Sequence, residues 1–403
     1  MALPKHLRPI HPFPARMAPE VVWDELPDHP PGRLRVLDPM AGSGTTLVVA
    51  KIRGHEAIGY DRDPLAVLIS RAWLNSVDPE RIQKKASEIL ARARMRARRI
   101  PLVKAYPQAA DLETKAFVRY WFDSTNRIQL TALADSISRL RDPTVRDQLW
   151  CAFSRLIITK QSGVSRAMDI SHSRPHRSFV HAPIRAFDHF ERAVKQVVRA
   201  APFAGAPEKS PASSVGFADA RRLPIDDSSV DLVITSPPYL NAIDYLRGHK
   251  FSLIWMGHTI QELRGIRSSN IGTESAGKNT RDRRTDGVLR LMCPTGKLSN
   301  KHAAMLRQYI LDVRAILSET SRVLRLGGKA VFVVGNCNLR DTFVRNSKCV
   351  IALARESGMV VRKVRRRPLP ENRRYLPPPE SSAAGKALKK RMREEVIITL
   401  LKT

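Results

Sequence analysis

A glycine-rich turn between an apolar stretch and a helical pattern constrains the fold of this chain more than any other feature. Residues 34–37 (LRVL) resemble a short buried strand, and residues 38–46 (DPMAGSGTT) follow them directly. Apolar residues at 47–50 then predict a helix. Strand, glycine turn and helix together are typical of a nucleotide-type cofactor site, because glycines let backbone N–H groups approach a ligand closely.

Acidic residues end the first two predicted strands. The first strand ends at Asp38, and a second apolar run at 57–60 ends at Asp61. With the helix between them, these runs predict a βαβ unit. A carboxylate about 20 residues beyond the turn can accept hydrogen bonds from both ribose hydroxyls. Asp38 suits hydroxyl and ammonium groups better than phosphates, and the pattern fits NAD and S-adenosylmethionine equally. The alternative is that both aspartates only cap turns or helices.

A second motif lies at the end of the apolar run 230–235 (VDLVIT). Ser236, Pro237, Pro238 and Tyr239 follow it directly. Two consecutive prolines at a strand end form a rigid ledge that carries a polar group and an aromatic ring. Such a ledge suits a flat ring that bears an amine. Taken alone the motif also fits a proline-rich turn, so its meaning depends on the glycine turn described above.

Two stretches of α/β character flank a helical middle in this chain of 403 residues. Further strands are predicted at 215–218, 230–235, 329–335, 359–364 and 395–401, which gives about seven in all. A helix is predicted at 301–324, and the helices of the middle region at 79–99, 112–122, 128–140, 145–160 and 183–200. We therefore expect residues 1–75 and 211–403 to form one split domain, with 76–210 as a helical insert that lacks strands. The polar stretch 264–300 is expected to be a flexible loop.

The charge of the chain indicates a polyanionic partner. Lys and Arg number 69 against 38 Asp and Glu, a formal net charge of +31, which favours nucleic acid. A membrane partner is not expected, since there is no apolar run of about 18 residues and no signal sequence. The sequence thus predicts a cytoplasmic protein, associated with the nucleoid if it is bacterial. Residues expected to contact DNA phosphates, or else to form solvated surface, are Arg92, Arg94, Arg96, Arg98, Arg283 and Arg284. The four cysteines have neither zinc-site nor disulfide spacing, and no metal is expected.

The two motifs together resemble those of the DNA methyltransferases that form N6-methyladenine or N4-methylcytosine. Three further segments are similar to parts of that family: 11–17 (HPFPARM), 218–224 (ADARRLP) and 323–328 (VLRLGG). The matching pieces cover most of 6–75 and 214–403. The helical middle matches none of these motifs, and the motif order places it between the second and third strands.

The resemblance implies a Rossmann-like class I methyltransferase sheet of seven strands, the last one antiparallel, and S-adenosyl-L-methionine as cofactor. The cofactor-binding residues that it implies are Phe13, Asp38, Pro39, Ala41, Gly42, Gly44, Thr45, Asp61, Asp219 and Ala220. It implies further that Ser236 and the carbonyl of the Pro237-Pro238 pair accept hydrogen bonds from the target amine. Tyr239 would stack on a base flipped out of double-stranded DNA.

Ser at position 236 favours, by resemblance, cytosine N4 over adenine N6 as the methylated atom. Methylation at carbon would need a cysteine nucleophile beside a proline, and Cys293-Pro294, the one such pair, follows no predicted strand. Two other functions stay open: an RNA base N-methyltransferase, and a DNA-binding protein that keeps the fold without the catalysis. A cognate restriction nuclease is a conceivable but not required partner.

Overall fold

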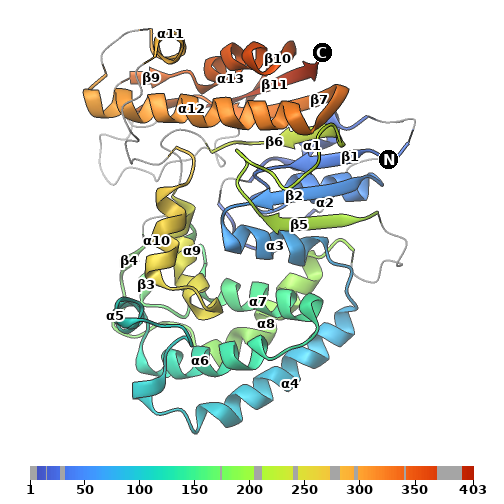
Figure 1. The fold of residues 1–403 in the computed structure, drawn as a ribbon. Helices are drawn as coiled ribbons and strands as arrows, with labels where there is room; N and C mark the ends of the chain where they lie inside the picture. The colour runs from blue at the N-terminus through green and yellow to red at the C-terminus, as the bar shows by residue number, and fades with distance from the viewer. Residues whose placement is uncertain are drawn as a thin grey trace.

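The computed structural model describes residues 7–14, 16–27, 32–172, 175–203, 211–238, 244–272, 282–294, 298–339, 342–369 and 393–403. These residues form a sheet with helices on both faces and a helical region beyond one edge of the sheet (Figure 1). None of the helices in these ranges is both long and apolar enough to span a bilayer.

Seven strands form the sheet, in the order β10-β11-β7-β6-β1-β2-β5. Their bounds are β1 (Arg35–Asp38), β2 (Glu56–Asp61), β5 (Ser213–Phe217), β6 (Val230–Thr235), β7 (Leu324–Gly335), β10 (Met359–Pro368) and β11 (Glu394–Lys402). Strand β11 pairs antiparallel with both of its neighbours, whereas the other pairs in the sheet are parallel. The predicted Rossmann-like class I methyltransferase fold, with its reversed last strand, is confirmed.

The strand order reverses direction between β1 and β6. The chain runs outward from β1 through β2 to β5 and then returns to place β6 on the other side of β1. At such a reversal the loops after the two central strands lead to opposite faces of the sheet and leave a crevice for ligands. The glycine turn follows β1 and the Ser-Pro-Pro segment follows β6, so both motifs lie at this crevice.

Alternating residues of the central strands pack against helices on opposite faces of the sheet. Leu232 and Ile234 belong to one hydrophobic cluster, whereas Val233 between them belongs to the other. The first cluster includes α1 (Pro19–Glu25), α2 (Thr45–Ile52) and α3 (Pro64–Leu74), and the second includes α12 (Asn300–Val323) and α13 (Asn346–Ala354). A sheet covered on both faces explains why its strands are nearly continuous apolar runs.

The helical middle continues the first hydrophobic cluster away from the sheet (Figure 1). It contains α4 (Pro79–Ala97), α5 (Leu112–Trp121), α6 (Ser124–Ser138), α7 (Pro143–Ile157) and α8 (Ala186–Ala200). Four of these helices begin directly after an aspartate whose carboxylate accepts a hydrogen bond from an N–H group of the first turn, namely Asp78, Asp111, Asp123 and Asp142. Two hydrogen bonds also connect the region to α3. The Trp73 side chain donates to the Ala200 carbonyl at 3.0 Å, and the Gln148 side chain donates to the Ala72 carbonyl at 2.6 Å.

The structure corrects two expectations about irregular regions. The middle region contains a short antiparallel hairpin, β3 (Ala167–Met168) and β4 (His176–Arg177). The stretch 264–300, expected to be a loop, contains the end of α10 (Ile260–Ser268) and all of α11 (Arg283–Met292). Helices α9 (Tyr245–Leu253) and α10 pack against α7 and α5, so the chain re-enters the helical region after the Ser-Pro-Pro segment. The remaining short elements are η1 (Leu102–Lys104), η2 (Ile170–His172), η3 (Ile254–Met256), η4 (Arg355–Ser357), β8 (Cys337–Leu339) and β9 (Thr342–Val344).

Replacing Phe332 by Ala is expected to lower the free energy of unfolding by about 3–5 kcal/mol, because a large side chain 1% exposed in the second cluster leaves a cavity. Leu326→Ala on the same strand is the matched control. Leu326 is 79% exposed, so its truncation should cost less than about 0.5 kcal/mol. Urea denaturation measures both changes, and equal losses in the two variants would contradict this placement of β7.

Candidate active site

A buried hydrogen bond joins the carboxyl ends of β1 and β6. The Thr235 hydroxyl donates to Oδ1 of Asp38 at 2.7 Å, and the Met40 N–H group donates to the same oxygen at 3.1 Å. Asp38 is 2% exposed and Thr235 is fully buried. Burial raises the pKa of Asp38 to about 6 although these hydrogen bonds oppose the shift. This bond therefore holds the glycine turn and Ser236, the residue after Thr235, together at the carboxyl ends of the central strands.

The carboxylate of Asp61 closes the glycine turn from the side of β2. Its Oδ2 accepts from the Gly42 N–H at 2.8 Å and its Oδ1 from the Asp63 N–H at 2.8 Å. Burial, and then the charge of Asp63, raise the pKa of Asp61 to about 7. The turn itself needs glycine, since Gly42 has φ 52° and Gly44 has φ 84°.

Phe13 reaches this turn from the N-terminal segment. Its Cε1 would lie 3.6 Å from a Cβ atom added to Gly42, and its ring stacks on Tyr245 with centroids 5.3 Å apart. The segment is held by His11, whose Nε2 lies 2.9 Å from the Ser154 hydroxyl of α7. Burial, and then the charge of Arg155, lower the pKa of His11 well below its usual value. His11 is therefore neutral at physiological pH.

His249 is a buried site residue that the sequence did not reveal. Its ring lies 5.1 Å from that of Phe13, and its Nδ1 shares a hydrogen bond of 2.5 Å with Oδ2 of Asp63. Asp63 also caps α3 by accepting from the Leu65 N–H at 2.9 Å. The one sequence signal is the spacing of four between Tyr245 and His249, which places both rings on one face of a helix. Their pairing partners are too distant in sequence to infer.

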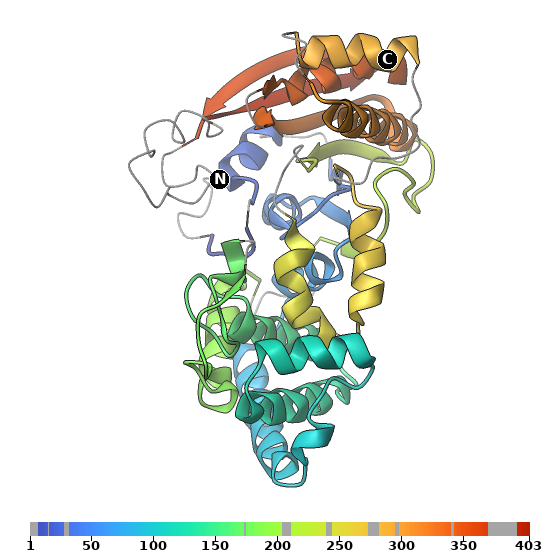
Figure 2. The same cartoon turned by 90° about the vertical axis from the view of Figure 1, so that its left-hand side faces the viewer.

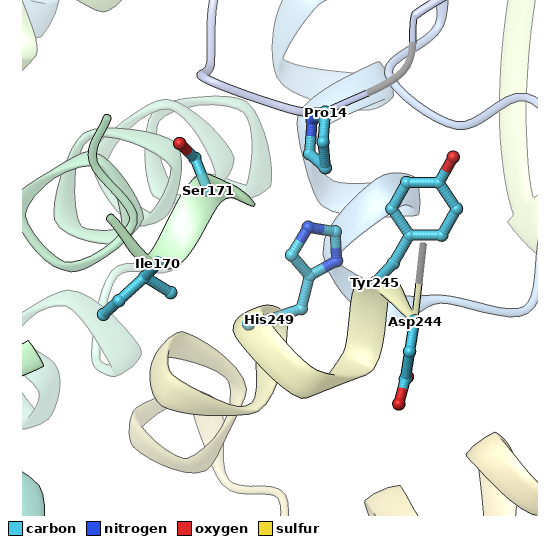
Figure 3. Close-up of a pocket in the computed structure, with 7 residues that line it drawn as sticks. Pro14, Ile170, Ser171, Asp244, Tyr245 and His249 are labelled. Atoms are coloured by element: carbon cyan, nitrogen blue, oxygen red, sulfur yellow. The ribbon is translucent and has the colours of Figure 1, made fainter. Parts of the chain in front are cut away.

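A small cavity opens beside these rings. It is lined by Pro14, Ile170, Ser171, Asp244, Tyr245, Gly248 and His249. Figure 3 shows the rings of Tyr245 and His249 projecting from α9 toward Pro14, whereas the Asp244 carboxylate points away from them. That carboxylate instead pairs with Arg267 at 2.6 Å. His249 Nε2 is buried and has no hydrogen-bond partner in the described part of the chain.

Asp219 also follows the carboxyl end of a strand, β5, and its carboxylate forms ion pairs with two arginines. Oδ2 accepts from Arg62 at 2.6 Å and from Arg221 at 2.7 Å, and Oδ1 accepts from the Arg221 backbone and side chain at 3.0 Å. Burial alone would raise the pKa of Asp219, but these arginines outweigh it and hold the pKa below its usual value. Arg62 follows Asp61 directly, which connects this ion cluster to the turn. Ala220 is buried beside it.

The other predicted site residues cluster around the turn and the ledge. Pro39, Ala41 and Thr45 belong to the segment from the end of β1 to the start of α2. Ser236 and Pro238 are half-buried and Pro237 is buried directly after β6, whereas Tyr239 lies outside the described residues. Among the residues that the structure describes, no group of three or more His, Cys, Asp or Glu side chains is placed to hold a metal ion.

The arginines predicted to contact DNA are not brought to this site. Arg94 and Arg96 of α4 lie near carboxylates, Asp188 at 3.8 Å and Asp135 at 2.9 Å. Figures 1 and 2 place the second half of α4, which carries Arg92 and is followed directly by Arg98, at the end of the helical region farthest from the sheet. Arg283 and Arg284 begin α11, which packs on α12 and α13.

Replacing Gly44 by Ala should destabilise the protein by more than the positive φ angle of Gly44 alone would cost. A Cβ at Gly44 would meet Ser70 Oγ at 2.8 Å and Ser70 Cα at 3.1 Å. Gly54→Ala is the matched control, because Gly54 has the same φ of 84° but open space around its Cβ position. We expect Gly44→Ala to lower the free energy of unfolding, measured by thermal denaturation, by about 1–2 kcal/mol more than Gly54→Ala does. Equal losses would mean that Ser70 yields to the methyl group.

Comparisons with known proteins agree with the predicted resemblance. No family profile matches the chain. It is 22% identical to the Type II methyltransferase M.MvaI of Kocuria varians, over 81% of this chain and 76% of that protein. It is 21% identical to the Type II methyltransferase M.BsoBI of Geobacillus stearothermophilus, over 75% of this chain and 68% of that protein. Among solved structures, a SAM-dependent methyltransferase from Methanosarcina mazei aligns with 95% of this chain and 96% of its own, at 8% identity and a TM-score of 0.32. The curated relatives confirm the resemblance to methyltransferases that the motifs predict.

Proposed function

We propose that this relative of Type II methyltransferases transfers a methyl group from S-adenosylmethionine to an exocyclic amine of a base in double-stranded DNA. The observation that carries the proposal is the buried bond between Thr235 and Asp38. It fixes the glycine turn, which suits a cofactor, against the Ser-Pro-Pro ledge, which suits an amine. Methyl transfer requires the donor and the amine to meet in line, so positioning supplies much of the rate.

The acidic residues at the turn favour S-adenosylmethionine over NAD. Asp38 is buried and Asp61 is half-buried, and the loss of hydration is the main cause of their raised pKa values of about 6 and 7. The negative charge of a poorly hydrated carboxylate is stabilised by a cationic or hydroxyl-bearing ligand. The same charge would repel a pyrophosphate. Asp61 would accept hydrogen bonds from the ribose hydroxyls, and Asp38 and the turn would face the amino-acid end. When bound, the cofactor supplies a methyl group activated by a sulfonium.

The ledge would prepare the target amine. The lone pair of a base amine is delocalised into the ring, so acceptors that draw the nitrogen toward tetrahedral geometry make it a better nucleophile. Ser236 and the Pro237 carbonyl would provide these acceptors. Base flipping exposes the amine at a cost of a few kcal/mol, which stacking on Tyr239 would offset. We further propose cytosine N4 as the methylated atom, because Ser in the first ledge position resembles the cytosine-specific enzymes.

Carbon methylation does not fit the surroundings of Cys293. The residue lies at the end of α11, where burial raises the pKa of its thiol. A nucleophilic cysteine would need the opposite shift.

The helical region, 76–210, would recognise the target sequence, since the cofactor site and the ledge both belong to the sheet.

Expression in a host that lacks DNA methylation is expected to yield N4-methylcytosine in the genomic DNA, measured by mass spectrometry of nucleosides. Ser236→Ala should lower its amount about a hundredfold, as the loss of one preorganised hydrogen-bonding group does in other active sites. Ser214→Ala, on the exposed edge strand β5, serves as the control and should retain activity. N6-methyladenine instead would overturn the base assignment. Methylated RNA alone, or no methylation, would overturn DNA methylation.

Cofactor affinity should weaken as the pH falls below about 7. The ionised form of Asp61 accepts hydrogen bonds from the ribose hydroxyls, and its pKa is about 7 because of burial and the charge of Asp63. Each pH unit below that value should cost up to about tenfold in Kd. Calorimetric titration between pH 5.5 and 8.5 measures this dependence. Asp61→Asn should weaken binding at pH 8 and flatten the profile, and a flat profile in the wild type would contradict the role.

The same carboxyl has the opposite effect on the stability of the free protein. Its folded pKa lies above the unfolded value of about 3.9, so the protonated form is the one that folding favours. The stabilisation that it contributes is complete below pH 4 and is lost as the pH rises through 7. The cofactor therefore binds best above pH 7, the pH range in which the Asp61 carboxyl contributes least to the stability of the free protein.

A further inference from the structure

Exposed basic and aromatic side chains gather where the β3–β4 hairpin packs against the end of α5. We define the hairpin patch as Arg119, Tyr120, Arg166, His176 and Arg177. The Arg177 guanidinium lies over the Tyr120 ring, 5.1 Å from its centroid, and Tyr120 is 50% exposed. Arg119, His176 and Arg177 are exposed as well. Exposed aromatic rings beside arginines provide a stacking surface and phosphate contacts together.

The backbone under the patch is held in place. The Arg166 guanidinium donates to the carbonyls of Arg119 and Tyr120, at 3.3 and 3.4 Å, at the end of α5. The Arg166 N–H group donates to the Trp121 carbonyl at 2.7 Å, and the Ser178 N–H group donates to the Arg166 carbonyl at 2.9 Å. The hairpin and the helix therefore present their side chains as one unit.

The positive charge of the patch is not neutralised within the described residues. There, none of Arg119, Arg166 and Arg177 has a carboxylate within ion-pair distance, whereas Arg96 of α4 pairs with Asp135 at 2.9 Å. Neighbouring like charges repel one another, and a polyanion removes that cost on binding. Charge thus distinguishes the patch from the arginines of α4.

The hairpin of the patch belongs to the same chain segment as two residues that line the cavity beside Tyr245 and His249. Ile170 and Ser171, a few residues beyond β3, line that cavity opposite Tyr245 and His249 (Figure 3). A Cβ atom on Gly248 of α9 would lie 2.8 Å from the Ile170 carbonyl oxygen, so the hairpin segment and α9 are in close contact. Figure 2 shows the green hairpin segment on the side of α9 that faces away from α10.

We propose that the hairpin patch binds the DNA strand next to the flipped base. Its arginines contact phosphates, and Tyr120 stacks on a base left exposed when its neighbour leaves the helix. This assignment rests on the proposed function and adds to it the surface that holds the substrate. It also moves the DNA contact away from α4 and its C-cap residue Arg98, where the sequence predicted four of the contacting arginines.

The test compares two double variants that each remove two positive charges from the helical region. Arg119→Ala/Arg177→Ala changes the patch, and Arg92→Ala/Arg98→Ala, called the α4 variant, changes the last turns of α4 and its C-cap. Binding of a fluorescein-labelled DNA duplex is measured by anisotropy at several salt concentrations, with S-adenosylhomocysteine present. The patch variant should lose about tenfold or more in affinity, and its slope of log K against log salt should become shallower by about 2. The α4 variant should stay within about twofold of the wild type.

Tyr120 gives a second readout. Tyr120→Ala should weaken duplex binding about fivefold or more, and Tyr120→Phe should restore it, because stacking needs the ring and not the hydroxyl. Circular dichroism and calorimetric cofactor binding should be unchanged in all four variants, which separates lost contacts from lost folding.

Each outcome supports or overturns the assignment. Equal affinities and salt slopes in the two double variants would overturn the patch, while wild-type methylation of genomic DNA would leave the proposed function intact. A wild-type protein that binds no duplex DNA would overturn both. Binding of RNA through the patch, without DNA binding, would replace the proposed substrate.

Discussion

The hydrogen bond between Thr235 and Asp38 is the interaction on which the rest of the site depends. Two residues 197 positions apart meet because β6 returns to pair with β1 after the chain has built β2, the helical region and β5. A buried carboxylate without donors would cost several kcal/mol. The hydroxyl and the Met40 N–H group reduce that cost. The same bond sets the distance between the turn and the ledge.

The charge distribution around the turn departs from what stability alone would favour. Asp38 and Asp63 are buried and Asp61 is half-buried close to them, and the donors to these three carboxylates are mainly backbone N–H groups. Their burial raises the pKa values of Asp38 and Asp61. A site that is unfavourable when empty and compensated by a cationic ligand is typical of binding sites, where local rules of stability are broken for function.

The sheet and the turn could be predicted because their signals are local. Runs of β-branched residues ending in aspartate or glycine identify the strands, and only glycine suits the φ angles at 42 and 44. Helix α11 was missed because its polar composition hides the spacing of Thr285, Val288 and Met292 on one buried face. The β3–β4 hairpin has two-residue strands fixed by contacts with α5, and no local signal encodes such contacts. The bond between His249 and Asp63 spans 186 residues and depends on the fold itself.

The course of the chain couples the helical region to the ledge. Ser236 continues from β6, which belongs to the sheet, whereas Tyr245 begins α9, which packs on α7 and on the segment of Ile170. Ser236 is thus fixed by the sheet and Tyr245 by the helical region. Any displacement of the helical region toward a bound polymer would be carried through α9, Tyr245 and His249 to the Phe13 ring and the glycine turn. Under the proposed function, a contact of the helical region with DNA and the geometry of the glycine turn are therefore mechanically linked, although the residues involved are far apart in sequence.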